Sequence, residues 1–301
     1  MKEPVGTEPN AEPSIQSRME PGTESAEAAG ATLMQGVALH GELFVMKCGG
    51  STLAALPDSF FDDLRQLQQG GVQPVIVHGG GPAISDNLGK LGIESRFVNG
   101  LRVTTEAVLD VVEMTLAGSI NKTVVRRIQS RGGRALGLSG VDGGLLTAQP
   151  VANSEEVGLV GEVTAVNAGL LAGISGMGYI PVVAPVGVDA GGQRYNINAD
   201  TAAGAVASHL AAGRMIVVTD VPGIMATVDG EKIVLPEVTV AQIGQLIESG
   251  EIYGGMIPKV RAAIDCIQGS VSAVVIVDGK EPGVLSRVLG GEPIGTRIVR
   301  G

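Results

Sequence analysis

The sequence contains no tryptophan, and it has only four phenylalanines and three tyrosines among its 301 residues. Hydrophobic residues still make up 44% of the chain, so we expect a large core built from Val, Ile, Leu, Ala and Met. The two cysteines, Cys48 and Cys266, are too few for the disulfide framework of a secreted scaffold. We therefore predict that both are reduced core residues.

Positive charge is also scarce, because the formal net charge of the chain is −10. A general nucleic-acid-binding protein needs a basic face that displaces counterions from phosphates, so we predict no nucleic-acid partner. A small anionic ligand is compatible with this charge, since a few placed lysines can create a local positive site.

The familiar nucleotide-binding and catalytic motifs are missing. The chain has no GxxxxGK[ST] segment, no GxGxxG after a strand, and no DFG or HRD segment of a protein kinase. Its three histidines, His40, His78 and His209, do not lie near a GxSxG segment. A Ser-His-Asp triad and a His/Cys metal cluster therefore have no support, and we predict no metal bound by the protein itself.

A secretory leader and a membrane span are not expected either. Residues 1–30 are acidic, rich in Pro, Gly, Ser and Ala, and lack an apolar core segment. The uncharged run over 163–188 is long enough for a bilayer, but it contains five glycines, an asparagine and two prolines. We interpret it as a buried helix (167–177) followed by a buried strand (179–185), and we predict a cytoplasmic protein without membrane contact.

The chain divides by composition into a tail and a globular part. Residues 1–39 hold six glutamates against Lys2 and Arg18, which predicts a disordered acidic tail. The tail is either a solvated leader or a partner-binding segment. Strands then alternate with helices, which predicts an α/β fold, a three-layer α/β/α sandwich with a mainly parallel central sheet. We place an N-terminal lobe at 40–212 and a C-terminal lobe at 213–301.

The hydrophobic pattern predicts the elements of these lobes. A hairpin should turn at Asn99-Gly100, and residues 140–165 should form hairpins or irregular sheet. Strands are predicted over 43–48, 74–78, 134–139, 179–185, 215–220, 272–277 and 296–299. Helices are predicted over 58–69, 82–91, 105–130, 167–177, 198–212, 239–249 and 256–268.

Two of the predicted strands run directly into glycine turns. Lys47 lies near the end of the first strand, before Gly49-Gly50, and the second strand leads into Gly79-Gly80-Gly81. Such turns expose backbone N–H groups, and the helix that follows adds the positive end of its dipole. Together with Lys47 they predict a site for an anion, with phosphate as the leading candidate. The alternative is that Lys47 is only an exposed lysine at a strand end.

Two turns contain side chains that could bind a ligand. Arg102 follows the Asn99-Gly100 turn, and its guanidinium suits a bidentate grip on a carboxylate unless it is merely solvated. The segment 196–200 (NINAD) offers two amides and a carboxylate at a helix start. Asn198 or Asp200 either caps that helix or binds a ligand.

Three further residues have two interpretations each. His78 precedes the second glycine turn, and a lone histidine there is more often a structural hydrogen-bonding group than an acid or base. Asp220 follows an apolar strand, at the strand end where α/β sheets bind ligands. Lys259 lies in the first turn of a helix, where a cation opposes the helix dipole unless an anion separates them.

Together these segments resemble the amino-acid kinase family, and within it the enzymes that phosphorylate N-acetyl-L-glutamate. The resemblance covers residues 43–301 and is most specific in NGLRVT and NINAD. The segments that carry it are KCGGS (47–51), VHGGGP (77–82), NGLRVT (99–104), NINAD (196–200), TDVPGI (219–224) and GGMIPK (254–259).

The resemblance implies transfer of the γ-phosphoryl group of ATP, bound with Mg²⁺ as MgATP, to the side-chain carboxylate of N-acetyl-L-glutamate. The product would be an acyl phosphate of arginine biosynthesis, formed without a covalent enzyme intermediate. The resemblance also implies a homodimer, with acceptor-binding and dimerisation functions in 40–212 and ATP binding in 213–301.

The resemblance also assigns roles to residues. Lys47 and Lys259 would stabilise the transferring phosphoryl group, and Asp200 would orient both lysines. Residues that would bind the acceptor are Gly80, Gly81, Arg102 and Asn196. Residues that would contact phosphate through backbone N–H groups are Gly49, Gly50 and Gly80. Residues that would line the nucleotide are Thr219, Asp220, Val221, Gly223, Ile224, Met225, Tyr253, Gly255 and Met256.

One departure and several rival functions stay open. Arginine-inhibited relatives carry an apolar N-terminal helix that joins dimers into a ring, whereas helix character here is confined to about 25–39 and is poor in large apolar residues. We therefore expect a homodimer without strong arginine feedback. The rivals are a kinase for acetylaminoadipate, aspartate, glutamate or uridylate, and a non-catalytic nucleotide-binding regulatory protein. The amides of 196–200 favour an acylated acceptor nitrogen, and the presence of both lysines with Asp200 favours catalysis.

Overall fold

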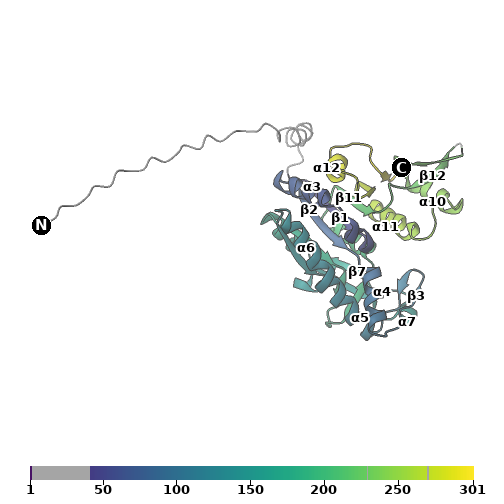
Figure 1. The fold of residues 1–301 in the computed structure, drawn as a ribbon. Coiled ribbons are helices and arrows are strands. Elements are labelled where there is room, and N and C mark those ends of the chain that lie inside the picture. The colour runs from purple at the N-terminus through teal and green to yellow at the C-terminus, as the bar shows by residue number, and fades with distance from the viewer. Residues whose placement is uncertain (2–40, 229, 270) are drawn as a thin grey trace. The chain divides into compact units, whose positions relative to one another are not determined.

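The fold is built around one eight-stranded sheet (Figure 1). The structure, a computed structural model, describes Met1 and residues 41–228, 230–269 and 271–301. Beyond Met1, the predicted acidic tail and the weak helix near 25–39 lie outside the described residues.

The central sheet is mainly parallel, as predicted. Every neighbouring pair of strands is parallel except β15 and β16. The inner strands are almost continuously apolar and buried, which is typical of a parallel sheet covered on both faces. In spatial order the strands are β14 (Glu237–Thr239), β16 (Thr296–Val299), β15 (Ala273–Asp278), β11 (Arg214–Thr219), β1 (Leu43–Cys48), β2 (Gln73–His78), β8 (Ile180–Ala184) and β5 (Ala135–Ser139).

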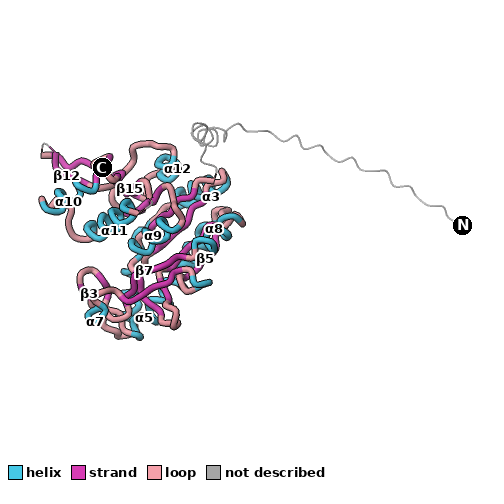
Figure 2. Tube along the Cα trace, turned by 180° about the vertical axis from the view of Figure 1, so that it is seen from behind, coloured by secondary structure: helices cyan, strands magenta, loops and turns pink. Residues whose placement is uncertain are grey.

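Helices cover both faces of this sheet, which confirms the three-layer α/β/α sandwich (Figures 1 and 2). The helices that share one apolar core with alternate strand residues such as Val45 and Val217 include α8 (Ala168–Gly176), α9 (Ala199–His209) and α11 (Met256–Gln268). The other layer contains α3 (Asp58–Gln69), α6 (Asn121–Ser130) and α12 (Val284–Leu289).

Smaller units surround the sheet. Four strands close a small barrel: β6 (Leu146–Pro150), β7 (Val160–Val166), β9 (Val186–Val188) and β10 (Arg194–Ile197). The hairpin of β3 (Phe97–Val98) and β4 (Leu101–Arg102) turns at Asn99-Gly100, as predicted, and both turn residues have positive φ. A second hairpin joins β12 (Met225–Val228) to β13 (Glu231–Val234). The remaining segments are α2 (Gly50–Ala55), α4 (Gly81–Lys90), α5 (Glu106–Glu113), the π-helical η2 (Met114–Ile120), the short η3 (Asp142–Gly144), α7 (Ser154–Val157) and α10 (Val240–Glu248).

Most predicted elements are present, several with the predicted bounds. The helix predicted over 105–130 is one run of α5, η2 and α6, with a π-helical middle. The uncharged run over 163–188 folds into the end of β7, then α8, β8 and β9. Within the described ranges, no helix combines the length and apolarity that a membrane crossing needs. The prediction missed α2, α12, the β12–β13 hairpin and the edge strand β14. The lobe boundary at 212/213 stays a prediction, since β11 pairs directly with β1.

Candidate active site

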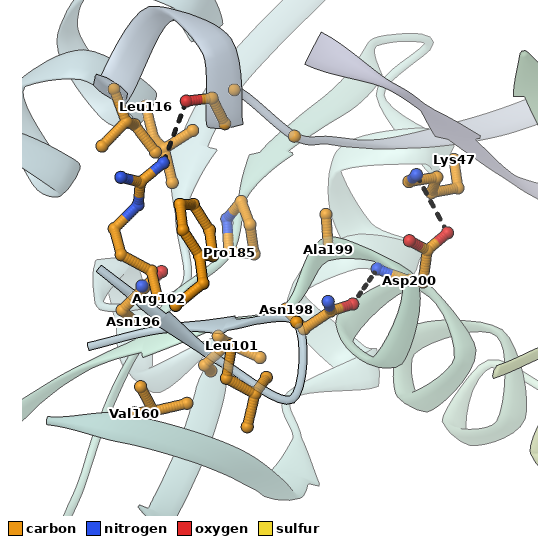
Figure 3. Close-up of a pocket in the computed structure, with 17 residues that line it drawn as sticks. Lys47, Leu101, Arg102, Leu116, Val160, Pro185, Asn196, Asn198, Ala199 and Asp200 are labelled. Carbon is orange, nitrogen blue, oxygen red and sulfur yellow. Dashed lines mark hydrogen bonds and ion pairs between the residues drawn. The ribbon is translucent and has the colours of Figure 1, made fainter. Parts of the chain in front are cut away.

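A buried ion pair lies at the centre of the sheet. Lys47 is near the carboxyl end of β1, between β11 and β2, and only 5% of its surface is exposed. Its Nζ lies 2.9 Å from Oδ1 of Asp200, in the first turn of α9 (Figure 3). A buried ammonium is costly unless it is paired, so Asp200 accounts for the charge in a central strand. Lys47 is thus not an exposed strand-end lysine.

The local sequence explains why Asp200 is available for this pair. The side-chain Oδ1 of Asn198 accepts hydrogen bonds from the N–H groups of Asp200 and Thr201, at 2.8 and 3.3 Å. Asn198 is therefore the cap of α9. The carboxylate of Asp200 is left to face Lys47.

The ion pair lies on the wall of a cavity of about 220 Å³. The four predicted acceptor-binding residues, Gly80, Gly81, Arg102 and Asn196, all line the same cavity (Figure 3). Gly49 and Gly50 do not. Apolar lining residues that the sequence did not single out are Ile84, Phe97, Leu101, Leu116, Val160, Pro185 and Ile197.

Arg102 is held at the cavity and is not merely solvated. Its guanidinium donates to Gly81 O and Ser85 Oγ, each at 3.0 Å, and also to the hydroxyl of Ser95. It lies 4.6 Å from the ring centroid of Phe97. Burial lowers the pKa of Arg102 from its ordinary value, but an arginine remains protonated. The structure thus presents a fixed, charged fork to the cavity.

The glycine loop before α4 is packed tightly against the π-helical segment. A Cβ at Gly80 would lie 2.4 Å from Cδ1 of Ile120 and 2.6 Å from Cδ2 of Leu116. Any larger residue there would therefore require the side chains of Leu116 and Ile120 to move. Because π-helical turns are frequent at functional sites, this segment is part of the candidate site even though the hydrophobic pattern predicted only a regular helix.

His78 lies beneath the loop and is fully buried. Its Nδ1 lies 3.2 Å from Gly79 O, and its Nε2 lies 3.2 Å from Nδ2 of Asn121. Burial lowers the pKa of His78 to about 4, so the ring is neutral near pH 7. This geometry favours the structural interpretation of His78 over an acid or base.

Lys259, the second predicted catalytic lysine, is half-buried in the first turn of α11. Its Nζ donates to Gly255 O at 3.1 Å, and it does not line the 220 Å³ cavity. Burial lowers the pKa of Lys259 and the charge of Lys47 lowers it further, whereas Asp200 and Asp220 act in the opposite direction. The charged groups of Lys47, Asp200, Asp220 and Lys259 therefore lie within electrostatic range of one another.

A second cavity, of about 180 Å³, lies between the β12–β13 hairpin and the start of α11. Six of the nine predicted nucleotide-lining residues line it: Val221, Gly223, Ile224, Met225, Tyr253 and Met256. Thr219, Asp220 and Gly255 do not. Lys232, on β13, also lines this cavity and was missed because the hydrophobic pattern did not indicate the hairpin.

Thr219 has an evident structural role in the turn that leads into this cavity. Its Oγ1 accepts from the N–H of Val221 at 3.2 Å and lies 3.1 Å from Val277 O on the neighbouring strand. The hydroxyl thus fixes the chain where β11 ends. Asp220 follows directly and is exposed.

Comparison with known proteins identifies the family of this architecture. The profile of the amino acid kinase family matches residues 42–278, from the start of β1 to the end of β15. The chain belongs to the amino acid kinase family. Among curated members, the acetylglutamate kinase of Halalkalibacterium halodurans is 50% identical over 241 residues, covering 80% of this chain and 91% of the relative. That of Geobacillus kaustophilus is 50% identical over 240 residues, with the same two shares.

Solved structures agree with this family assignment. Smu.665 from Streptococcus mutans matches with a TM-score of 0.76 and 30% identity, covering 86% of this chain and 99% of its own. An N-acetylglutamate synthase from Neisseria gonorrhoeae matches with a TM-score of 0.78 and 22% identity, covering 92% of this chain and 64% of its own. At that identity the second likeness concerns the fold alone.

Proposed function

We propose that this amino acid kinase family member transfers the γ-phosphoryl group of MgATP to the side-chain carboxylate of N-acetyl-L-glutamate. The product is an acyl phosphate, and the step belongs to arginine biosynthesis. Relatives named acetylglutamate kinases, about half identical over most of the chain, support this activity. The observation that carries it is one cavity with Arg102 at one end and the Lys47–Asp200 pair at the other (Figure 3).

The chemistry of the cavity suits an acylated amino acid. Arg102 would grip the α-carboxylate, and Gly81 and the amide of Asn196 would bind the remaining polar groups of the acceptor. Within the described part of the chain, Asp200 is the one acidic residue in the lining, and it is paired with Lys47. A free α-ammonium would therefore lack a spare carboxylate partner. This favours N-acetylglutamate or acetylaminoadipate over aspartate or glutamate.

The transfer itself needs positioning and charge more than covalent help. A bond forms between an acceptor carboxylate oxygen and the γ-phosphorus while the bond to the bridging β–γ oxygen breaks. The attacking carboxylate is already ionised at neutral pH, so no general base is required. Lys47 and Lys259 would neutralise charge on the migrating group, with Asp200 orienting them. The N–H groups of Gly49, Gly50 and Gly80 would bind its oxygens.

ATP would occupy the second cavity, lined by residues of the β12–β13 hairpin and α11. Thr219, Asp220 and Gly255 complete the proposed nucleotide-binding set from just outside that lining. Mg²⁺ would arrive with the nucleotide as MgATP and neutralise part of its phosphate charge. This division assigns the acceptor to residues 40–212 and the nucleotide to 213–301.

A homodimer is part of the proposal. Strand β5 is an edge of the central sheet, and its Leu136 is 41% exposed. Met114 of η2 is 60% exposed. An edge strand with exposed apolar neighbours favours association, so we place the dimer contact on this side. The lack of strong arginine feedback and a cytoplasmic location stay predictions.

One assay tests the activity and separates the rivals. The protein is incubated with MgATP, hydroxylamine and a panel of acceptors: N-acetylglutamate, N-acetylaminoadipate, aspartate, glutamate and uridylate. Hydroxylamine traps acyl phosphates as hydroxamates, which form a coloured complex with added Fe³⁺, and we expect product with N-acetylglutamate well above every other acceptor. ADP release is followed in parallel for uridylate, which forms no acyl phosphate. A lack of turnover with every acceptor would favour the non-catalytic regulatory protein.

A further inference from the structure

The ring of His78 joins the glycine loop to the π-helical segment. Its Nδ1 faces Gly79 O and its Nε2 faces the side-chain amide of Asn121, each at 3.2 Å. A carbonyl oxygen can only accept a hydrogen bond, so Nδ1 must carry the proton. In a neutral ring Nε2 is then an acceptor, and it receives a hydrogen bond from Asn121.

The orientation of the Asn121 amide agrees with this tautomer. Its Nδ2 also lies 2.8 Å from Val182 O and 3.2 Å from Leu138 O, so its two hydrogens are shared among three acceptors. Its Oδ1 receives a hydrogen bond from Nζ of Lys122 at 3.0 Å. A reversed amide would place an oxygen against two carbonyls, which is unfavourable. Asn121 can therefore only donate to His78, and the ring must be the Nδ1–H form.

This hydrogen bond has a consequence for the neighbouring peptide. The carbonyl of Gly79 and the N–H of Gly80 belong to one planar trans peptide unit, and they point in opposite directions. A donor that holds the carbonyl on the buried side therefore aims the N–H toward the other side, where Gly80 lines the acceptor cavity. The N–H groups at the start of α4 also lack intrahelical acceptors, so they are available for an anion.

We propose that His78 is a positioning residue, which fixes the Gly79–Gly80 peptide so that the Gly80 N–H points at the transferring phosphoryl group. Asn121 holds the ring in the required tautomer. Leu116 and Ile120 pack against Gly80 and restrict sideways movement of the loop. The hydrogen bond from His78 to Gly79 O restricts the remaining motion, which is rotation of the peptide plane. This inference deepens the proposed phosphotransfer and rests on it for its catalytic meaning.

Two substitutions at His78 separate this role from general stability. In asparagine the amide nitrogen is bonded to Cγ, as Nδ1 is in histidine. The side chain of His78→Asn can therefore still donate a hydrogen bond to Gly79 O. The amide of glutamine reaches the position of Nε2, so His78→Gln keeps the contact with Asn121 but not the one with Gly79. Each variant loses one hydrogen bond, and their thermal midpoints should be similar.

Activity should divide the two variants. We expect kcat to fall on the order of tenfold or more in His78→Gln and by no more than about threefold in His78→Asn, since misplaced groups cost rate steeply. The KM for ATP should stay at the wild-type value in both. His209→Gln, at an exposed site on the same chain, is the matched control. Equal kcat values for the two His78 variants, or a larger loss in His78→Asn, would overturn the proposal.

A second measurement does not depend on activity. The chain has three histidines, so ¹⁵N-histidine NMR of the wild type, assigned with the His78 variants, reports the tautomer directly. We expect a protonated Nδ1 and an unprotonated Nε2 at His78, unchanged from neutral pH to about pH 5. An Nε2–H tautomer or a charged ring would overturn the inference. If NMR shows the expected tautomer but the protein forms no acyl phosphate, the proposed function is rejected and the tautomer assignment stands.

Discussion

The position of Lys47 in a buried strand indicates an anion-binding site. It interrupts an apolar strand in the middle of a parallel sheet, with 5% of its surface exposed. Desolvation of an ammonium there costs several kcal/mol, and the 2.9 Å contact with Asp200 offsets part of that cost. A well-packed apolar residue would serve stability at least as well. The retained charge is therefore explained by the anion that the cavity is proposed to bind.

We expect Lys47→Ala and Lys259→Ala each to lower kcat by on the order of 10²-fold or more, as does the loss of other groups that stabilise a transition state. The measurement is steady-state hydroxamate formation at saturating MgATP and N-acetylglutamate. Lys90→Ala is the matched control, because that lysine is 67% exposed and forms its ion pair with Asp86 on its own helix. Near-normal turnover in both purified lysine variants would contradict the assigned roles.

Arg102→Ala should act on acceptor binding and leave the chemical step less affected. Loss of a charge-assisted grip on a carboxylate costs about 1.5–3 kcal/mol, so the KM for N-acetylglutamate should rise roughly tenfold to a hundredfold. The KM for ATP should stay unchanged, because the nucleotide cavity is separate. Arg96→Ala, at an exposed arginine near the same hairpin, is the control. An unaltered acceptor KM would remove Arg102 from the site.

At the scale of residues, the sequence predicted the site residues better than it predicted their hydrogen-bond partners. Lys47, Arg102 and Asp200 stand out because charged groups at strand ends and turns are readable from a pattern. The link between His78 and Asn121 was not predicted, since it joins residues 43 positions apart through a hydrogen bond. Nothing in local spacing indicates that Asn121 points at His78.

At the scale of elements, the short helix α12 depends on a residue far away in the chain. Both Oδ atoms of Asp63, on α3, face the start of α12. Oδ2 accepts from the N–H groups of Leu285 and Ser286, at 2.9 and 3.2 Å, and the hydroxyl of Ser286 donates to Oδ1. The helix has no side-chain cap of its own, because its N-cap residue is Gly283. Asp63 thus supplies the missing cap from a different helix.

We expect Asp63→Ala to lower the free energy of unfolding by about 1–3 kcal/mol, because buried N–H groups would be left without an acceptor. Urea denaturation followed by circular dichroism measures the change. The neighbouring Asp62→Ala is a matched control. Asp62 forms a partly exposed ion pair with Arg131, so its removal should cost less than about 1 kcal/mol. Equal losses of unfolding free energy in the two variants would show that the cap from Asp63 stabilises the fold no more than a surface ion pair does.

The missed elements share a physical cause. Helix α12 is six residues long between glycines, and a segment that short is not stable by its own propensity. The π-helical η2 has the same apolar spacing as a regular helix, so the pattern predicted only a helix there. The β12–β13 hairpin contains charged, exposed residues on β13, which a search for apolar alternation overlooks. Long elements with one buried face were predicted within a few residues.

At the scale of the whole molecule, the parallel topology brings the site residues together. Strands β1 and β2 are neighbours and run in the same direction, so their carboxyl ends lie side by side. These ends carry Lys47 and the Gly79–Gly81 loop. The alternation of strands and helices predicted that these carboxyl ends would lie together. It did not predict the small barrel, whose β10 carries Asn196, because the four strands of the barrel are only three to seven residues long and show no clear apolar alternation.

The buried His78 should also make the stability of the whole fold depend on pH. Burial lowers its pKa from 6.5 to about 4, so between these values the unfolded chain binds a proton that the folded chain does not. The stabilisation is fully present above pH 6.5 and is lost as pH falls toward about 4, by roughly 3 kcal/mol in all at 1.36 kcal/mol per pKa unit. Carboxylates titrate in the lower part of this range, so the informative quantity is the difference between wild type and His78→Asn. Urea unfolding free energies of the two proteins should converge as the pH decreases. A constant difference across the range would mean that His78 is not buried as a neutral ring.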